Sequence, residues 1–368
     1  MGRVLRSLDD FRALVLGASI YGCGGGGDPV KGLAMLKEVF VDRGRDLEVL
    51  DVEDVGGGFV ASVYEVGTVA PSARLRKVAR VSNTVGRALE LFKRLGLAIS
   101  AFCPVELGGG NTAVALYAAG LAGIPVVDGD RVGRAAPEIH QDAAVLMGVS
   151  LAPAAAVTPT GNEVLILGYA DVDDYEAVLR HLSVLAGTHV TVVDAPMSPG
   201  EAARVLIRGS LTKCLELGER ILEARRRGLF VPRVVAEEMG GWIVFHGVVR
   251  EWSWRDEGGF LVGTLLIEGV GEYRGRTLRS FVKNEHIAVW IDGEPLVLPP
   301  DIFTLVRSDG EPVLNNSIEP GVEVWGVAAP APSVWRSEKG LELFGPKRFG
   351  IPHDYTPVEK LVAAHTQP

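Results

Sequence analysis

The chain has few cysteines, and none of them is spaced for pairing or metal binding. Cys23, Cys103 and Cys214 are the three cysteines in 368 residues, with no Cys-x-x-Cys pair and no histidine at zinc-finger spacing. Disulfide-stapled and zinc-finger proteins carry closely spaced cysteines, so neither class is indicated. We expect three reduced thiols.

The sequence also lacks a long apolar run and an excess of positive charge. No stretch approaches the roughly 18 apolar residues of a membrane span. The first 17 residues carry acids within their amphipathic pattern, unlike a secretory signal peptide. The net charge is −9, whereas a nucleic-acid-binding protein usually presents a basic field. We therefore expect a cytoplasmic protein that binds neither a membrane nor a nucleic acid.

Side-chain amides are scarce as well. The chain contains two glutamines and six asparagines, and arginine far outnumbers lysine. Because amides are heat-labile, this composition is typical of proteins from hot environments. It predicts a thermophilic source and leaves the function open.

The chain has enough length and apolar content for two domains. At 368 residues with 47% hydrophobic residues it exceeds the size at which a single core stops growing. Short alternating runs separated by Gly, Asp and Pro turns make the segment 240–330 rich in predicted β structure. The predicted fold class is α/β, with an N-terminal α/β domain over 1–168 and a C-terminal α+β domain over 169–368.

The clearest unit in the N-terminal half is a parallel βαβ crossover. Two almost continuous apolar strands, 97–105 and 124–128, flank the helical stretch 112–123. The strands end in Glu106 and Asp128. Ligands of open α/β sheets bind outside the carboxyl ends of the strands, so we expect a binding site there.

A run of glycines precedes another helix start. The run consists of Gly24, Gly25, Gly26 and Gly27. It lies between Cys23 and the pair Asp28-Pro29, which is an N-cap followed by proline at the first helical position. The run has no Lys-Ser/Thr of a P-loop and follows a helical pattern, so nucleotide binding has weak support. We predict a cradle of backbone amides for an anionic or polar ligand, with a flexible connector as the alternative.

Acidic residues and one arginine gather after the second of the two strands. The catalytic candidates of this cluster are Asp128, Asp130, Arg134 and Glu138. Clustered carboxylates hold hard cations or shift one another's pKa, so that one serves as general acid or base. The structural alternative is a turn followed by a helix start. Cys23 is a further candidate, because a thiol near a helix N-terminus can act as a nucleophile, although a small residue packed under a loop is commoner.

Four more residues are predicted to contact the ligand. Glu106 lies at a strand end, and Asn111 is the expected cap of the helix 112–123. Asn284 and Glu285 interrupt the apolar strand "FVKNEHIAVW". Strand alternation places Asn284 and His286 on one face of the strand and Glu285 on the opposite face. Such polar residues lie at a sheet edge or point toward a cleft.

Several segments resemble, in this order, those of one known family. The segments are "GASIYGCGGGGDP", "ELGGGNT", "PVVDGDRVGRAAPE", "RGSLTKCLELG", "FVKNEH", "LPPDIFTLV" and "GPKRFGIPHDY". They resemble the DUF917 family, also called the S-methyl thiohydantoin desulfurase family, over nearly the whole chain.

The resemblance implies an N-terminal α/β domain with the glycine and acidic motifs and a C-terminal domain ending in β structure. It also implies hydrolytic loss of methanethiol from an S-methylated thiohydantoin, which leaves a hydantoin. Members are often described alongside hydantoinase or oxoprolinase proteins. Cys23 and Arg131 stand where the family pattern has other residues, which makes a different substrate plausible.

We therefore expect a hydrolase of a five-membered cyclic amide or its S-alkyl derivative, with a small-molecule substrate. Water activated by Asp128 or Glu138, or by a Zn²⁺ or Mn²⁺ ion that they hold, would attack the ring carbon between the two nitrogens. The glycine amides and Arg134 would stabilise the intermediate. The alternative is a non-catalytic accessory or ligand-sensing subunit of a hydantoinase/oxoprolinase-type system. The sequence leaves open both a homo-oligomer and a hydantoinase-type partner.

Overall fold

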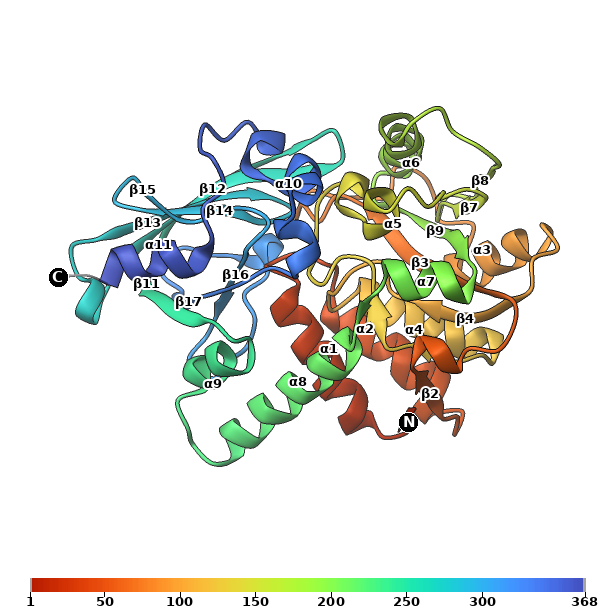
Figure 1. Ribbon diagram of the computed structural model, residues 1–368, viewed down its shortest axis with the longest axis horizontal. Coiled ribbons are helices and arrows are strands. Elements are labelled where there is room, and N and C mark those ends of the chain that lie inside the picture. The colour runs from red at the N-terminus through yellow and green to blue at the C-terminus, as the bar shows by residue number, and fades with distance from the viewer. Residues whose placement is uncertain (1, 367–368) are drawn as a thin grey trace.

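The computed structural model, which describes residues 2–366, shows two lobes that are each built on one large sheet (Figure 1). The α/β lobe contains an eight-stranded sheet in the order β1-β2-β5-β4-β3-β9-β7-β8. The β lobe contains a seven-stranded sheet in the order β15-β14-β13-β12-β11-β17-β16. This confirms the predicted α/β class with a β-rich C-terminal part.

The sheet of the α/β lobe is parallel at its centre and antiparallel at both edges. β2, β5, β4 and β3 run parallel to one another, which confirms the predicted βαβ crossover. The strands are β1 (Arg3–Leu5), β2 (Leu47–Leu50), β3 (Phe59–Gly67), β4 (Ile99–Cys103), β5 (Val126–Val127), β7 (Ala154–Val157), β8 (Glu163–Ile166) and β9 (His189–Met197).

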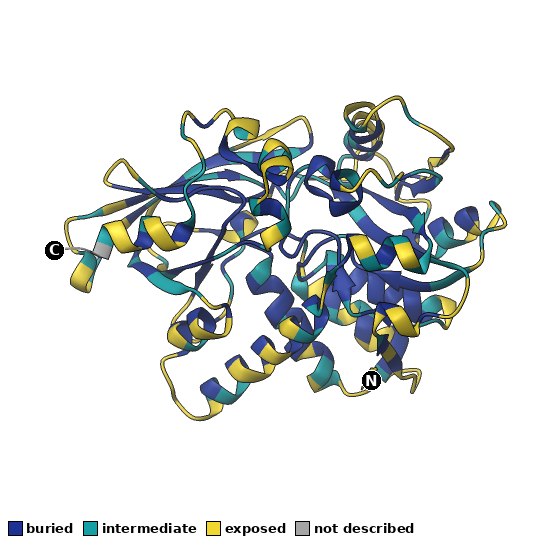
Figure 2. Cartoon of the chain, in the orientation of Figure 1, coloured by how far each residue is buried: buried dark blue, intermediate teal, exposed yellow. Residues whose placement is uncertain are grey.

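Helices cover both faces of this sheet, which is why its central strands are apolar along their whole length. One face packs on α1 (Leu8–Tyr21), α2 (Pro29–Leu36), α3 (Thr84–Lys93), α4 (Asn111–Ala122) and α8 (Ser210–Arg226). The other packs on α5 (Ala143–Leu146), α6 (Val172–Ala186), α7 (Pro199–Val205) and α10 (Glu338–Phe344). The strands and the inner helix faces are buried, and the outer helix faces are exposed (Figure 2).

The sheet of the β lobe is antiparallel throughout. Its strands are β11 (Trp242–Glu257), β12 (Phe260–Gly269), β13 (Thr277–Lys283), β14 (Glu285–Ile291), β15 (Glu294–Val297), β16 (Ile302–Val306) and β17 (Glu323–Ala329). α9 (Val231–Glu238) and α11 (Val358–Thr366) pack against this sheet. After β17 the chain returns to the α/β lobe, where Trp335 is buried and donates to the carbonyl of Val132 at 2.7 Å.

Short elements complete the chain. β6 (Gly129–Asp130) and β10 (Ile207–Arg208) pair with each other. Single helical turns are η1 (Lys37–Val41), η2 (Val52–Asp54), η3 (Ile139–Gln141), η4 (Gly271–Tyr273), η5 (Asn315–Ser317), η6 (Ser333–Arg336) and η7 (Pro346–Phe349). No helix within residues 2–366 is long and apolar enough to cross a membrane.

The first helix is longer than its sequence suggests. A stop at Gly17 looks natural from composition, yet α1 continues to Tyr21. A Cβ at Gly17 would lie 1.8 Å from the carbonyl oxygen of Cys214, so this glycine lets α8 approach the backbone of α1. A contact between helices, rather than a helix end, accounts for the residue.

The predicted division at residue 168 stays a prediction. β9 comes from beyond that residue but lies between β3 and β7 in the sheet of the α/β lobe. The strands of the β lobe start at Trp242.

Candidate functional site

A cavity of about 450 Å³ lies where the carboxyl ends of β3 and β4 meet the β lobe. Its volume is within the range of pockets that bind small molecules. Its wall includes eight of the residues predicted from the sequence: Gly26, Gly27, Asp28, Glu106, Asn111, Glu138, Asn284 and Glu285. Six other predicted residues are not part of the wall: Cys23, Gly24, Gly25, Asp128, Asp130 and Arg134.

The glycine loop (residues 22–28) fits between the two lobes as bare backbone. On its α/β side, the amides of Gly110 and Asn111 both donate to the carbonyl of Gly26 at 3.0 Å. Gly26 has φ 72°, and a Cβ there would lie 2.6 Å from the Cα of Gly108. Only glycine combines this backbone conformation with so close an approach of two loops.

On its other side the glycine loop is bonded to the β lobe. The amide of His286 donates to the carbonyl of Cys23 at 2.9 Å, and the amide of Asn315 donates to that of Gly24 at 2.8 Å. A Cβ at Gly25 would lie 2.0 Å from Oε1 of Glu285. The loop therefore sets the place of Glu285 as well as joining the lobes.

Asp28 begins α2 as the sequence predicts. Its Oδ1 accepts from the amide of Val30 at 2.8 Å, the usual bond of an N-cap aspartate. The carboxylate thus stabilises the helix start while it lines the cavity.

Two buried carboxyl groups, one from each lobe, face this cavity. Glu106 is 7% exposed and Glu285 is 3% exposed. Oε1 of Glu106 accepts from Nδ2 of Asn111 at 2.7 Å, and Oε2 accepts from the amide of Ala136 at 2.8 Å. Oε2 of Glu285 is buried and has no hydrogen-bond partner among residues 2–366.

Burial makes both carboxyl groups weaker acids than an exposed glutamate. It raises the pKa of Glu106 to about 7, against the donors Asn111 and Ala136, which favour the ionised form. Burial also raises the pKa of Glu285 well above its ordinary value, and repulsion from the neighbouring Glu106 carboxylate adds to the rise. Glu285 therefore holds its proton more firmly than Glu106, which is close to half ionised at neutral pH.

Asn111 holds Glu106 in place. The prediction that Asn111 caps this helix is wrong, because the cap is Gly110 and Asn111 is the first residue of α4. Its Oδ1 accepts from the amide of Glu65 at 2.9 Å, so the side chain links the end of β3 to Glu106.

Asn284 forms the turn between β13 and β14 and is not part of a continuous strand. Its φ is 57°, and the chain reverses there, so that Lys283 of β13 pairs with Glu285 of β14. The predicted alternation of faces through this segment is therefore wrong. Asparagine tolerates the left-handed conformation better than most residues, which the apolar pattern around it does not reveal.

The carboxylates of the acidic cluster after β5 mostly accept hydrogen bonds that stabilise the fold. The carboxylate of Asp128 accepts from the amide and the hydroxyl of Thr212, at 3.0 and 2.6 Å, in the first turn of α8. Asp130 is buried, which raises its pKa to about 6, and one of its oxygens accepts from the amides of Val132 and Gly133 in a turn.

Arg134 is buried and donates to backbone carbonyls. Its guanidinium contacts the carbonyl oxygens of Ala135, Pro300, Asp301 and His286 at 2.8–3.1 Å. Three of these carbonyls belong to the β lobe, so this arginine fastens one lobe to the other.

Glu138 lines the cavity but is paired with two cations. Burial favours its protonated form, yet the ammonium of Lys283 and the guanidinium of Arg348 outweigh burial and hold the pKa of Glu138 below its ordinary value. It caps η3, close to the helix start that the sequence predicts.

Cys23 is a buried, neutral thiol. It is fully buried, and burial raises its pKa to about 11. Its Sγ donates to the carbonyl of Tyr21 at 3.2 Å. Such a thiol is not ionised at neutral pH, which a nucleophilic cysteine has to be.

The residues predicted to hold Zn²⁺ or Mn²⁺ do not fit a metal ion. Asp128 and Asp130 accept hydrogen bonds within the fold, and Glu138 is neutralised by two cations. Within residues 2–366 no group of three or more His, Cys, Asp and Glu side chains is arranged to bind a metal ion.

Two features of the cavity wall were missed in the sequence. Lys31 and His189 both contact the carboxylate of Glu65, at 3.1 and 3.3 Å. Glu65 lies near the carboxyl end of β3, so the rule that pointed to Glu106 also applies to it. Arg180 also lines the cavity, from the middle of α6, where nothing in the sequence distinguishes it from a solvated helix residue.

Comparisons with known proteins agree with this architecture. A family model described as "S-Me-THD-like, N-terminal domain" matches residues 9–168, and one described as "S-Me-THD-like, C-terminal domain" matches residues 170–358. A crystal structure of a protein from Chromobacterium violaceum is similar in fold, with a TM-score of 0.77 at 20% identity, over 97% of this chain and 100% of that one. No curated protein is significantly similar.

Proposed function

The chain belongs to the S-methyl thiohydantoin desulfurase (DUF917) family, as its motifs predicted, and on this basis we propose that it hydrolyses an S-alkylated five-membered cyclic amide. The products are a thiol and the corresponding hydantoin. The observation that supports the proposal most is the carboxyl pair Glu106 and Glu285. Two neighbouring carboxyl groups in different protonation states are what general acid and base catalysis at neutral pH requires.

In the first step, water adds to the ring carbon between the two nitrogens. The ionised form of Glu106 takes a proton from the water as the new C–O bond forms. The protonated carboxyl of Glu285, which has a free oxygen, gives its proton to the adjacent ring nitrogen as the C=N double bond becomes single. The product is a neutral tetrahedral intermediate that carries a hydroxyl and the S-alkyl group.

In the second step, the intermediate collapses to the hydantoin. The hydroxyl proton returns to Glu285 as the C=O bond forms, and the C–S bond breaks. The proton on Glu106 passes to the leaving sulfur, so both carboxyl groups regain their starting states. The amide of Gly27, a loop glycine on the cavity wall, is the proposed donor to the developing charge on oxygen, whereas the amide of Gly26 bonds the carboxyl group of Glu285.

None of the five predicted catalytic residues takes part in this proposal. Asp128, Asp130 and Arg134 bond within the fold and lie off the cavity wall, and Cys23 is a neutral thiol. Glu138 lies on the wall, but its pairing with Lys283 keeps it ionised and unsuited to proton transfer.

The test is thiol release from S-methyl thiohydantoins, followed with a chromogenic disulfide reagent. We expect Glu106→Gln and Glu285→Gln each to lower kcat at least about a hundredfold, with Glu48→Gln, an exposed carboxylate on β2, as the control. Wild-type turnover should rise with pH through about 7 as Glu106 ionises. A wild-type protein that binds the compounds but releases no thiol would overturn the hydrolase and favour the ligand-sensing alternative.

A further inference from the structure

The carboxyl pair depends on how the lobes are held together. Glu106 follows β4 in the α/β lobe, and Glu285 begins β14 in the β lobe. Nothing local in the chain fixes one group relative to the other. Contacts between the lobes near the cavity must therefore do so.

Glu285 moves with the tip of the β11–β12 hairpin. The adjacent turn residue, Asn284, donates its amide to the carbonyl of Leu261 at 2.7 Å, and its Oδ1 accepts from the amide of Leu261 at 2.9 Å. Lys283, on the other side of the turn, pairs with Val262 of β12. Any displacement of the hairpin tip is thus transmitted to Glu285.

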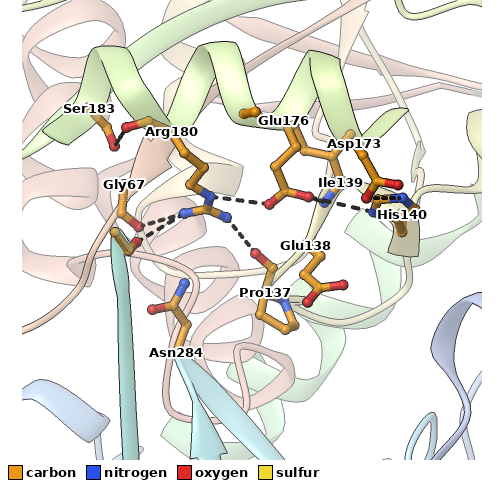
Figure 3. Close-up of polar contacts among 12 residues, drawn as sticks. Gly67, Pro137, Glu138, Ile139, His140, Asp173, Glu176, Arg180, Ser183 and Asn284 are labelled. Carbon is orange, nitrogen blue, oxygen red and sulfur yellow. Dashed lines mark hydrogen bonds and ion pairs between the residues drawn. The ribbon is translucent and has the colours of Figure 1, made fainter. Parts of the chain in front are cut away.

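Arg180 of α6 holds that hairpin tip against the α/β lobe. Its Nη1 donates to the carbonyls of Gly259 in the hairpin and of Gly67 at the end of β3, both at 3.2 Å. Its Nη2 donates to Pro137, and its Nε pairs with Glu176 on the same helix at 3.2 Å. Figure 3 shows the guanidinium with Gly67 on one side, Glu176 and Pro137 on the other, and Asn284 below it in this view.

Two cations contact the ring of Phe260 at the same place. The guanidinium carbon of Arg180 is 3.9 Å from the ring centroid, and Nζ of Lys283 is 4.3 Å from it. Both distances are well within the range of a cation–π contact. Lys283 in turn pairs with Glu138 of the α/β lobe.

We propose that the Arg180–Phe260–Lys283 stack is a positioning device that acts with the glycine loop to hold Glu285 opposite Glu106 and so completes the acid–base pair. Arginine is required because its planar fork donates to three separate carbonyls while its face contacts the ring, which a lysine ammonium cannot do. The charge of Arg180 also favours the ionised forms of both carboxyl groups. This role rests on the proposed hydrolase, but its first test does not.

Two conservative variants test it: Phe260→Leu, which keeps an apolar side chain on a partly exposed site, and Arg180→Lys, which keeps the charge. Arg279→Lys is the matched control, because Arg279 stacks at 4.1 Å on Trp290 of the same sheet and does not line the cavity. Amide hydrogen exchange of residues 259–262 and 283–286 should accelerate about tenfold in both test variants and stay unchanged in the control.

Two further readouts separate positioning from general destabilisation. The pKa of Glu285, followed by its carboxyl ¹³C resonance, should fall in both test variants as the group moves away from Glu106 and toward water. If the protein is a desulfurase, kcat should fall about tenfold with a smaller change in KM. Folded variants with unchanged exchange and an unchanged Glu285 titration would overturn the positioning role, whether or not wild type releases thiol.

Discussion

At the scale of single residues, the surroundings of Glu106 explain its chemistry better than its place in the sequence does. The carboxyl group has two hydrogen-bond donors, yet burial outweighs them and brings its pKa to about 7. Sequence pattern identified Glu106 as a residue at a strand end. Its burial is a property of the assembled fold, so its protonation state could not be predicted.

Glu106 makes stability depend on pH. Its pKa rises from 4.5 to about 7 on folding, so between these values the folded state binds a proton that the unfolded state has lost. The free energy of unfolding therefore falls as pH rises through this window, by up to about 3 kcal/mol. The Glu106→Gln variant has no carboxyl group to titrate at this position, so its free energy of unfolding does not show this fall.

We expect the Tm of Glu106→Gln minus that of wild type to increase from about pH 5 to about pH 8 and then to level off. Thermal unfolding across that range measures it, with Glu48→Gln as the control. A difference that is constant with pH would mean that Glu106 does not titrate as its burial implies.

At the scale of elements, regular local patterns were predictable and tertiary contacts were not. The cap and proline that begin α2, and the apolar strands around α4, follow from the sequence and are confirmed. Gly17 and Asn284 could not be interpreted in this way, because Gly17 lies at a helix–helix contact and Asn284 at a chain reversal that only the partner strands define.

The glycine loop gives a prediction at this scale. Gly25→Ala places a methyl group 2.0 Å from Oε1 of Glu285, so either the loop or the carboxyl group has to move. We expect the free energy of unfolding to fall by about 1–3 kcal/mol and the turnover of the substrate to fall with it.

Gly57→Ala is the matched control, because a Cβ at Gly57 meets nothing within 4 Å. Urea unfolding of both variants checks the expectation. Equal stability of the two would show that the loop yields freely at Gly25.

At the scale of the whole molecule, two residues far apart in the chain form one site. Glu106 and Glu285 were each singled out as polar residues at the end or interruption of an apolar strand. Their meeting depends on how two sheets dock, and no pattern within either segment encodes it. The docking surface itself includes buried polar contacts, among them the hydrogen bonds of Arg134 to three carbonyls of the β lobe.

Loss of Arg134 should loosen the lobes. Arg134→Met removes the donor to three carbonyls of the β lobe and leaves them buried, so we expect the free energy of unfolding to fall by about 3 kcal/mol or more. Arg250→Met, at an exposed position on β11, should change it by less than about 0.5 kcal/mol. Urea denaturation followed by far-UV circular dichroism compares them, and a loss below about 1 kcal/mol for Arg134→Met would contradict the role.

The origin of the two carboxyl groups in separate sheets has a genetic consequence. The chain passes from the helices that cover the first sheet to the strands of the second through the turn at Gly240, before β11. If the halves on either side of that turn are expressed as separate fragments and reassociate, each supplies one carboxyl group. Two inactive pairs of fragments, one altered at Glu106 and the other at Glu285, would then complement each other in the same cell, because the two unaltered fragments can associate.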